Sequence, residues 1–319
     1  MGKISVIIPT HNRADLLPRA VKSIQNQTMP VDEIIIVSDG STDNTDEVVK
    51  KMQREDDRIQ LISYHPGHNG NYARNQGLGR ATGEYIAFLD DDDEWLPQKT
   101  ELQMKVFEDN QKVGLVYAAQ HCIFLDTDTR YDTKPSWKGD LSKQIFIHND
   151  IGTPSQVIIK KSVLEEAGNF DLELGALQDY DLWIRCCQIT EIGFVAEPCI
   201  NYYNMASSNQ VSANTEKYIK ARRYMADKYK YITDTFSPDL RKQIDSIVEM
   251  RIAQRCLRNG KKKDARQFAL TSLKMRFSKQ AVALYIASFF SYKTVLKVRG
   301  KFKYLRRQKR VRKNDKFKA

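Results

Sequence analysis

The stretch Tyr85–Trp95, which reads YIAFLDDDDEW, decides the fold that we expect for this chain. Its first five residues are apolar, as in a strand buried on both faces of a parallel sheet. Four consecutive aspartates, Asp90–Asp93, follow directly, and four like charges on one loop repel each other unless water or a cation relieves them. Carboxylate oxygens in this position suit Mg²⁺ or Mn²⁺. The alternative is a solvated acidic turn that caps the next helix.

Strands and helices alternate on both sides of this stretch, which predicts βαβ units and a mainly parallel sheet. After residue 212, helical stretches follow one another without strands between them. We therefore expect a Rossmann-like α/β domain over residues 1–212 and a helical region over residues 213–319. The predicted strands are residues 4–8, 33–37, 59–63, 85–89, 114–118, 122–125, 156–159 and 194–196. The main predicted helices are residues 16–27, 96–110, 162–167, 179–188, 218–231, 238–259 and 263–277.

The composition of the 319 residues is that of a globular protein, with 41% hydrophobic and 29% charged side chains. No apolar run has the length of a membrane span. The five cysteines show no CxxC spacing, so we expect reduced thiols in a cytoplasmic protein and no zinc site.

Positive charge is concentrated at the C-terminus of a chain whose net charge is +11. The segment Lys293–Lys318 contains a single acid, Asp315, which points to an anionic partner. The apolar stretch Phe277–Val298 before the cluster Lys301–Lys313 suits a helix on an anionic bilayer, peripheral on the inner face of the cell membrane. The alternative is an ordinary packed helix with a solvated basic end. No nucleic-acid-binding motif is present, so no nucleic acid is expected.

Three polar loops follow predicted strands: Pro9–Arg13, Asp39–Asp43 and Asp90–Asp93. Because the carboxyl ends of parallel strands meet at one edge of a sheet, these loops would line one crevice. There, Thr10 and Asn12 offer hydrogen bonds to a ribose or base, and Asp39 can accept an N–H from a base. Such a pocket suits a nucleotide diphosphate with a bridging cation. The set expected to line it is Pro9, Thr10, Asn12, Asp39, Asn69, Arg74, Asp90 and Asp91.

Two further observations bear on the chemistry. The chain has no GxGxxG or Walker A motif, which argues against dinucleotide and P-loop ATP chemistry. Downstream, Gln178–Trp183 reads QDYDLW at a predicted helix start. One of its aspartates, Asp179 or Asp181, is either an N-cap or a general base that faces the metal site.

Four segments in this order resemble family 2 glycosyltransferases with the GT-A fold: SVIIPTHNR, IIIVSDGSTDNT, NGNYARNQGLGRATGEYIAFLDDDDEW and GNFDLELGALQDYDLWIR. The resemblance covers roughly residues 3–212. It implies an inverting transfer from a nucleotide-sugar, usually a UDP-sugar, to a hydroxyl of a glycan or lipid-linked glycan acceptor, with Mn²⁺ or Mg²⁺. A role in bacterial surface polysaccharide synthesis (capsule, lipopolysaccharide or teichoic acid) follows. The oligomeric state stays open, a homo-oligomer included.

The resemblance also implies roles for individual residues. Thr10 and Asp39 would hold the nucleoside, and Arg74 would contact the base or diphosphate. Asp90 and Asp92 match the DxD motif, with Asp92 as the metal ligand, although the run of four lets Asp91 or Asp93 share the work. Asp179 occupies the place of the catalytic base.

Two departures from the family pattern stand out. Gln178 replaces a common Glu, which removes a like charge beside Asp179. Asn204 stands where many members carry a basic residue that reaches the diphosphate. Trp95 and Trp183 each follow an acidic motif, and either could stack on a sugar or belong to the core. Alternative functions are a GT-A transferase that uses another nucleotide donor, such as a GDP- or dTDP-sugar, and a non-catalytic binding protein with a basic tail.

Overall fold

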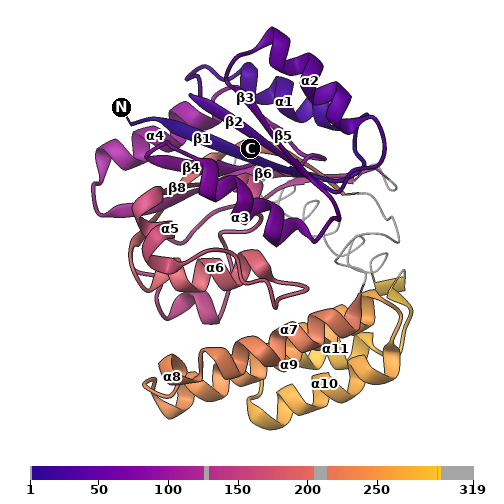
Figure 1. Ribbon diagram of the computed structural model, residues 1–319. Coiled ribbons are helices and arrows are strands. Elements are labelled where there is room, and N and C mark those ends of the chain that lie inside the picture. Colours follow the sequence, from indigo (N-terminus) through magenta and orange to yellow (C-terminus); the bar gives the residue numbers. More distant parts are fainter. Residues whose placement is uncertain (1, 126–128, 205–213, 293, 296–319) are drawn as a thin grey trace, which may run out of the picture. The chain divides into compact units, whose positions relative to one another are not determined.

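The computed structural model describes residues 2–125, 129–204, 214–292 and 294–295 (Figure 1). The chain divides into two compact units, Met1–Ser208 and Asn209–Ala319. The boundary that we expected near residue 212 lies outside the described residues. Among the described residues, no helix is both long enough and apolar enough to cross a bilayer.

The first unit is an α/β structure whose strands and helices alternate in the expected order. Its strands are β1 (Ile4–Thr10), β2 (Glu33–Asp39), β3 (Ile59–Tyr64), β4 (Tyr85–Phe88), β5 (Glu94–Trp95), β6 (Val113–Phe124), β7 (Thr129–Asp132), β8 (Val157–Lys160) and β9 (Glu191–Asn204). Its helices are α1 (Leu17–Gln25), α2 (Thr45–Glu55), α3 (Gly70–Arg80), α4 (Lys99–Asp109), α5 (Lys161–Ala167) and α6 (Gln178–Cys187), with short 3₁₀ turns η1 (Gln144–Phe146) and η2 (Pro154–Gln156).

One sheet in the order β3-β2-β1-β4-β8-β6-β9-β5 organises this unit, with β7 paired to β6. The strands β3, β2, β1 and β4 are mutually parallel, as the alternating pattern predicts. Further along, β8 lies antiparallel between β4 and β6, which makes the sheet mixed. Since β1, β2 and β4 run in one direction, the loops after them meet at the same edge, as expected.

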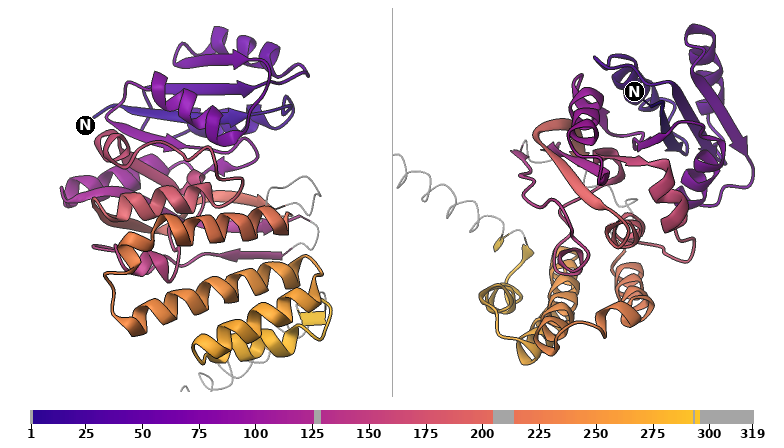
Figure 2. Two further views of the ribbon diagram at one scale, coloured as in Figure 1. Left: turned by 60° about the horizontal axis from the view of Figure 1, so that its bottom comes forward. Right: turned by 90° about the vertical axis from the view of Figure 1, so that its left-hand side faces the viewer.

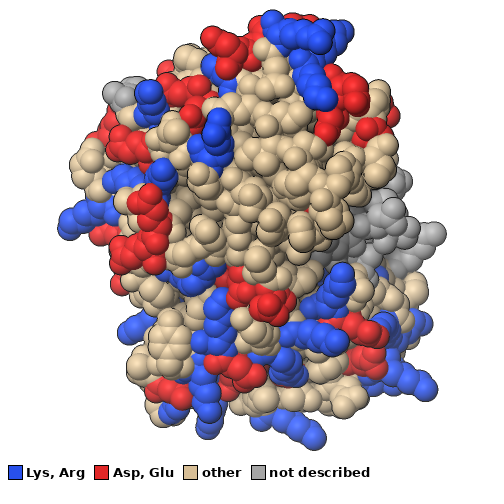
Figure 3. All heavy atoms as spheres, in the orientation of Figure 1, with Lys and Arg blue, Asp and Glu red and all other residues tan. Residues whose placement is uncertain are grey.

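Helices cover both faces of the sheet. Val6 and Ile8 of β1 share a buried cluster with Leu17 and Ile24 of α1, whereas Ile7 points to the other face, toward α3. This follows from the alternation of side chains along a strand. Helix α3 lies so close that a Cβ on Gly77 would sit 2.5 Å from Ile7 Cγ2, so only glycine fits. Figure 3 shows few charged side chains over α3.

Two of the predicted strands differ from the observed ones. The strand predicted at residues 122–125 is continuous with the one at 114–118 in β6, because the intervening residues stay extended and pair with β9 across a bulge. Strand β9 is also much longer than residues 194–196, since it pairs with both β6 and β5 and a register shift accommodates Pro198.

The second unit is helical, as expected, and its element order is clear in both views of Figure 2. Ser246 of α9 and Ser272 of α10 are buried and hydrogen-bond to each other, which fixes the packing of the two long helices. The C-terminal apolar stretch forms a separate short helix after α10. The helices are α7 (Thr215–Lys228), α8 (Lys230–Thr233), α9 (Pro238–Arg258), α10 (Lys262–Met275) and α11 (Lys279–Ala287).

Candidate active site

The loops after β1 and β2 are joined by Asn12. Its Oδ1 accepts the main-chain N–H of Thr42 at 2.7 Å and that of Asp43 at 3.3 Å. Asn12 has a left-handed φ of 53°, a conformation that asparagine tolerates better than most residues. The side chain that we expected to bind a ribose or base therefore fixes the shape of the crevice wall.

Asp39 lies at the end of β2 with one carboxylate oxygen committed. The main-chain N–H of His68 donates to Oδ1 at 2.7 Å, and the main-chain carbonyl of Asp39 lies 2.6 Å from His11 Nδ1. Gly40 and Gly67 let the two loops touch, because a Cβ on Gly40 would lie 2.4 Å from the nitrogen of Gly67. Asp39 is thus held rigidly. Burial first, and then the charge of Asp39 and a hydrogen bond to it, raise the pKa of the Tyr64 hydroxyl, which therefore lies close to this carboxylate.

Side chains of two other segments hold the acidic loop in place. Thr10 Oγ1 donates to Asp91 Oδ2 at 2.7 Å, which joins this loop to β1. Ser155 Oγ accepts the main-chain N–H of Asp90 at 3.1 Å and donates to Asp93 Oδ2 at 2.6 Å. Asp93 is fully buried, so it belongs to the support of the loop and not to its exposed edge. Asp90 and Asp92 remain partly accessible.

The electrostatics of this loop favour a cation. The pKa of the Asp91 carboxyl is raised to about 7, mainly by burial and to a smaller extent by the neighbouring Asp92 and Asp90, although the hydrogen bond from Thr10 lowers it. Burial and Asp90 also raise the pKa values of Asp92 and Asp93. The aspartates therefore destabilise one another's charged forms, which a positive charge placed between them would relieve.

Arg74 connects the acidic loop with the predicted base. Its Nη2 donates to Asp90 Oδ1 at 2.5 Å, and its guanidinium lies 5.5 Å from the centroid of the Phe170 ring. The charge of Arg74 also lowers the pKa of Asp179, while that of Asp90 raises it. Segments about 90 residues apart in sequence thus meet at one place.

The two aspartates at the start of α6 have separate roles. Asp181 is fully buried and pairs with Arg185 at 2.8 Å, and Arg185 also binds main-chain carbonyls of the α5–α6 turn. Asp179 accepts the N–H of Tyr180 at 2.7 Å, and burial raises its pKa to about 6. The ion pair thus gives Asp181 a structural role, and the role of Asp179 as base stays a prediction.

Trp95 and Trp183 belong to the core, which was one of the two alternatives; the other was stacking on a sugar. Their exposed fractions are 2% and 0%. The indole N–H of Trp95 donates to the carbonyl of Ser155, and that of Trp183 to the carbonyl of Gly152, both at 3.0 Å. Lys99 Nζ also lies 3.9 Å from the centroid of the Trp95 ring. Neither ring is available to a sugar, and both hold the segment 152–155 that carries Ser155.

Two arginines that sequence reasoning did not assign lie beside the acidic loop. Arg19 Nη2 donates to the carbonyl oxygen of Asp92 at 2.6 Å, and its guanidinium lies 4.3 Å from the centroid of the Tyr203 ring. The charges of Arg13 and Arg19 both lower the pKa of Asp92. Arg13 could have been found from the sequence, because it is the last residue of the polar PTHNR stretch after β1. Arg19 could not, because it lies inside the helical pattern of α1, where no motif marks it. The side chain of Asn204 lies outside the described residues.

The remaining predicted residues are structural in this state. Pro9 pairs with Val37 of β2, one residue before the end of β1. Asn69 is the N-cap of α3, where its Oδ1 accepts the N–H groups of Asn71 and Tyr72. Ser155 was not predicted. Its contacts are with the main-chain N–H of Asp90 and the buried carboxylate of Asp93, and no local sequence motif marks such a serine.

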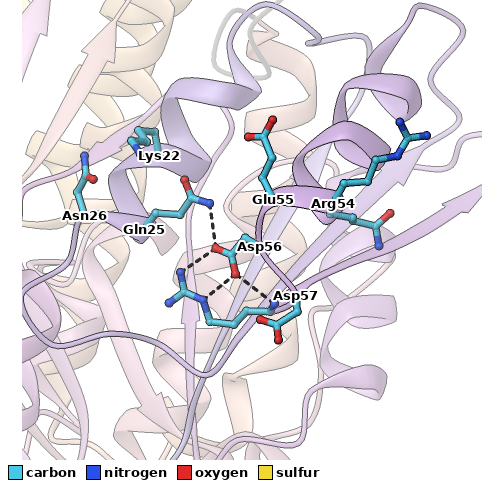
Figure 4. Close-up of a pocket in the computed structure, with 9 residues that line it drawn as sticks. Lys22, Gln25, Asn26, Arg54, Glu55, Asp56 and Asp57 are labelled. Carbon is cyan, nitrogen blue, oxygen red and sulfur yellow. Dashed lines mark hydrogen bonds and ion pairs between the residues drawn. The ribbon is translucent and has the colours of Figure 1, made fainter.

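A surface depression of about 700 Å³ lies elsewhere (Figure 4). Its lining comes from the end of α1 and the α2–β3 turn, at the amino ends of the strands. Within it, Asp56 accepts hydrogen bonds from Gln25 and Arg58, with the Arg58 pair at 2.7 Å. These contacts satisfy its charged groups and fix the turn, so the depression does not compete with the crevice as the reaction site.

The donor set of the crevice decides which metal would fit. Among the described residues, no group of three or more His, Cys, Asp or Glu side chains is placed to hold a metal ion. The partly accessible oxygens of Asp90 and Asp92 could supply one or two hard ligands. That fits Mg²⁺ or Mn²⁺ whose other ligands are water and substrate phosphate, and it does not fit a closed protein cage.

Comparisons with solved structures show the fold. Staphylococcus aureus TarS 1–349 in complex with UDP matches with a TM-score of 0.53 and 16% identity over 90% of this chain and 89% of that chain. In another TarS structure, the match with this chain covers 54% of the TarS chain. The mannosyltransferase PcManGT from Pyrobaculum calidifontis, in complex with GDP-Man and Mn²⁺, matches with a TM-score of 0.56 and 19% identity. The match covers 89% of this chain and 78% of the PcManGT chain. The fold is therefore GT-A, as expected.

Sequence comparisons show the family. A Campylobacter jejuni GalNAc(5)-diNAcBac-PP-undecaprenol beta-1,3-glucosyltransferase is 33% identical over 68% of this chain and 69% of that protein. The putative teichuronic acid biosynthesis glycosyltransferase TuaG of Bacillus subtilis is 27% identical over 68% and 84%. The model of Glycosyl transferase family 2 matches residues 5–168, from β1 through the acidic loop to α5. With these relatives and this fold, the chain belongs to glycosyltransferase family 2.

Proposed function

We propose that this chain is a metal-dependent, inverting glycosyltransferase that moves a sugar from a UDP-sugar to a hydroxyl of a glycan acceptor. The observation that carries the proposal is the pairing of Arg74 with Asp90 at 2.5 Å, together with the effect of both charges on the pKa of Asp179. Asp39 and Asp90 follow the parallel strands β2 and β4 at one edge of the sheet. A nucleoside site at Asp39, a diphosphate site at the acidic loop and a base at Asp179 would suit the reaction.

Asp39 would read the base. Its Oδ2 accepts the N3–H of uracil, while the main-chain N–H of His68 holds Oδ1 in place. A rigid acceptor discriminates well, because a base that cannot donate there leaves a buried carboxylate unpaired. Thr10 and Asp90 would contact the ribose, and Pro9, Asn12 and Asn69 would shape the wall around it.

Asp92, with Asp90 and Asp91 beside it, would hold Mn²⁺ or Mg²⁺. When bound, the metal would neutralise charge on the departing diphosphate. Arg13 and Arg19 would add positive charge there in place of the basic residue that Asn204 does not supply. Arg19 is suited to this because its Nη2 already binds the carbonyl of Asp92 at 2.6 Å.

Asp179 would act as general base. Its carboxylate takes the proton of the acceptor hydroxyl as that oxygen attacks the anomeric carbon from the face opposite the leaving nucleotide. The bond to the diphosphate oxygen breaks, UDP leaves with the bonding electrons, and the anomeric configuration inverts. A pKa of about 6 keeps Asp179 ionised at neutral pH and basic enough to accept the proton.

The acceptor is proposed to be a glycan or lipid-linked glycan of the bacterial surface. The name of the Campylobacter jejuni relative includes an undecaprenol-linked glycan, and that of TuaG includes teichuronic acid. We accordingly place the enzyme in the cytoplasm and at the membrane surface. The tail Lys293–Lys318, which we expected to contact an anionic membrane, lies almost entirely outside the described residues.

A thermal-shift screen with Mn²⁺ and UDP, GDP or dTDP tests the donor class, since a ligand of the native state raises the melting temperature. We expect a Mn²⁺-dependent shift with UDP alone. A shift with GDP in place of UDP would favour the second candidate, a GDP-sugar transferase, which the complex of PcManGT with GDP-Man motivates. No shift with any nucleotide would favour a binding protein without catalysis.

A further inference from the structure

The hairpin of α10 and α11 carries many of the exposed large apolar side chains of the second unit. Phe277, Ile286, Phe289 and Phe290 are exposed by 74%, 55%, 50% and 52%. Leu270, at 38%, is exposed in the middle of α10. We call these five residues, with the basic residues Lys263, Arg266 and Lys274 of α10, the hairpin face. Large aromatic side chains are costly to leave in water, so such a gathering indicates a binding surface.

The basic residues of the hairpin face lie beside two of its apolar residues, Leu270 and Phe289. Lys263, Arg266, Leu270 and Lys274 recur at helical spacing and line one shallow depression of about 390 Å³. The Arg266 guanidinium lies 3.8 Å from the centroid of the Phe289 ring, which joins this stripe to the end of α11.

The opposite side of α11 is used for packing within the unit. Ala281 and Ser288 are fully buried, and Leu284 is 9% exposed. These residues recur every three or four positions, so they form one face of the helix. Ile286 lies on the opposite side of α11 from that face, and Phe289 and Phe290 follow the end of the helix. The exposed aromatic residues are therefore not the loose end of a poorly packed core.

The charge around these apolar residues has one sign. The stretch 261–292 contains seven Lys or Arg residues and one acid, Asp264. The 27 residues from Lys293 to Ala319 add 13 basic residues and one acid, Asp315. Since the whole chain carries +11, the residues before Lys261 have a net negative charge. Positive charge is thus confined to the part of the chain that presents the hairpin face.

We propose that the hairpin face docks on an anionic lipid bilayer, with the aromatic side chains in the headgroup–acyl boundary and the basic side chains on the lipid phosphates. Aromatic rings between Lys and Arg suit an interface that is apolar below and anionic above. A nucleic acid would use the charge but leave Phe277 and Ile286 in water. The inference deepens the proposed location and stands apart from the donor site, since it involves none of the crevice residues.

The test is co-sedimentation of the full chain with phosphatidylcholine vesicles and with the same vesicles containing phosphatidylglycerol. We compare the wild type with the double variant Phe277→Ser/Phe290→Ser. Tyr231→Ser is the matched control, because Tyr231 is an aromatic residue of the same unit, 71% exposed, outside the hairpin. Circular dichroism melting and the UDP thermal shift show that each variant is folded, independently of lipid.

We expect binding only to the phosphatidylglycerol vesicles, weakened about tenfold by the double variant and unchanged by Tyr231→Ser. Equal binding of the double variant and the wild type would overturn the proposal, because the basic tail alone would then account for the attraction. Absence of vesicle binding would overturn it as well. So would a dimer in size-exclusion chromatography that the double variant dissociates, since the face would then be covered by a second copy.

Discussion

Replacing Ser155 by Ala should destabilise the first unit strongly, although Ser155 touches no proposed substrate. Its Oγ is buried, accepts the N–H of Asp90 at 3.1 Å and donates to Asp93 Oδ2 at 2.6 Å. The variant leaves both groups without this partner. Each buried polar group that loses its partner costs about 1–3 kcal/mol, so we expect a loss of about 2–5 kcal/mol in the free energy of unfolding.

Urea unfolding followed by tryptophan fluorescence measures this loss in the relevant unit. Trp95, Trp137 and Trp183 are the three tryptophans of the chain, and all lie within Met1–Ser208. The signal therefore reports on the unit that contains Ser155. Ser162→Ala is the matched control, because Ser162 is exposed on α5, and it should change the unfolding free energy by less than about 0.5 kcal/mol.

A second measurement separates stability from function. Without Ser155, the N–H of Asp90 no longer fixes the acidic loop, so UDP should bind more weakly in the presence of Mn²⁺ under conditions where the variant is fully folded. A loss of unfolding free energy below about 1 kcal/mol would refute the assignment of Ser155 as the anchor of the loop. Unchanged UDP binding in a destabilised variant would show that the anchor serves folding alone.

The other predictions concern the crevice itself. Asp179→Asn should reduce transfer by about 10²–10⁴-fold while UDP binding, measured by calorimetry, stays as in the wild type; weaker UDP binding would contradict its role as base. Since only the ionised base accepts a proton and its pKa is about 6, the transfer rate should be flat above that pH and fall tenfold per pH unit below it, and a profile that rises toward acid would exclude Asp179. Asp92→Asn should abolish the Mn²⁺-dependent part of the UDP thermal shift, with Asp109→Asn on α4 as an unaffected control. Arg19→Gln should weaken UDP binding about tenfold by removing the charge at the carbonyl of Asp92, and Arg19→Lys should restore part of it.

Much of the fold could be predicted because its signals are local. The apolar runs of β1, β2 and β4 and the polar loops after them identify parallel strands with a shared edge, and the structure confirms both. The antiparallel insertion of β8 could not be predicted. It is set by pairing with β4 and β6, and Val157–Lys160 alone reads as any short buried strand.

The candidate site likewise contains residues that the sequence predicts and residues whose contacts only the structure shows. Asp90 and Asp179 stand in recognisable motifs, and the structure brings both near Arg74. Asn12 and Asn69 looked like ligands from their polarity, yet their oxygens cap loop and helix N–H groups. A sequence shows which side chains can form hydrogen bonds, but the choice between a substrate and a neighbouring loop depends on three-dimensional proximity.

The position of β8 bears on the order in which the protein matures. Strands β1 to β4 and the crossovers between them are complete by residue 88, so the half that holds the nucleoside can form from contacts close in sequence. The acidic loop gains its anchor, Ser155, only with η2 and β8, some 65 residues later. On the ribosome, a nascent chain would therefore possess the aspartates well before it could hold them in place. Maturation of the proposed donor site should be a late folding step that the N-terminal half cannot complete alone.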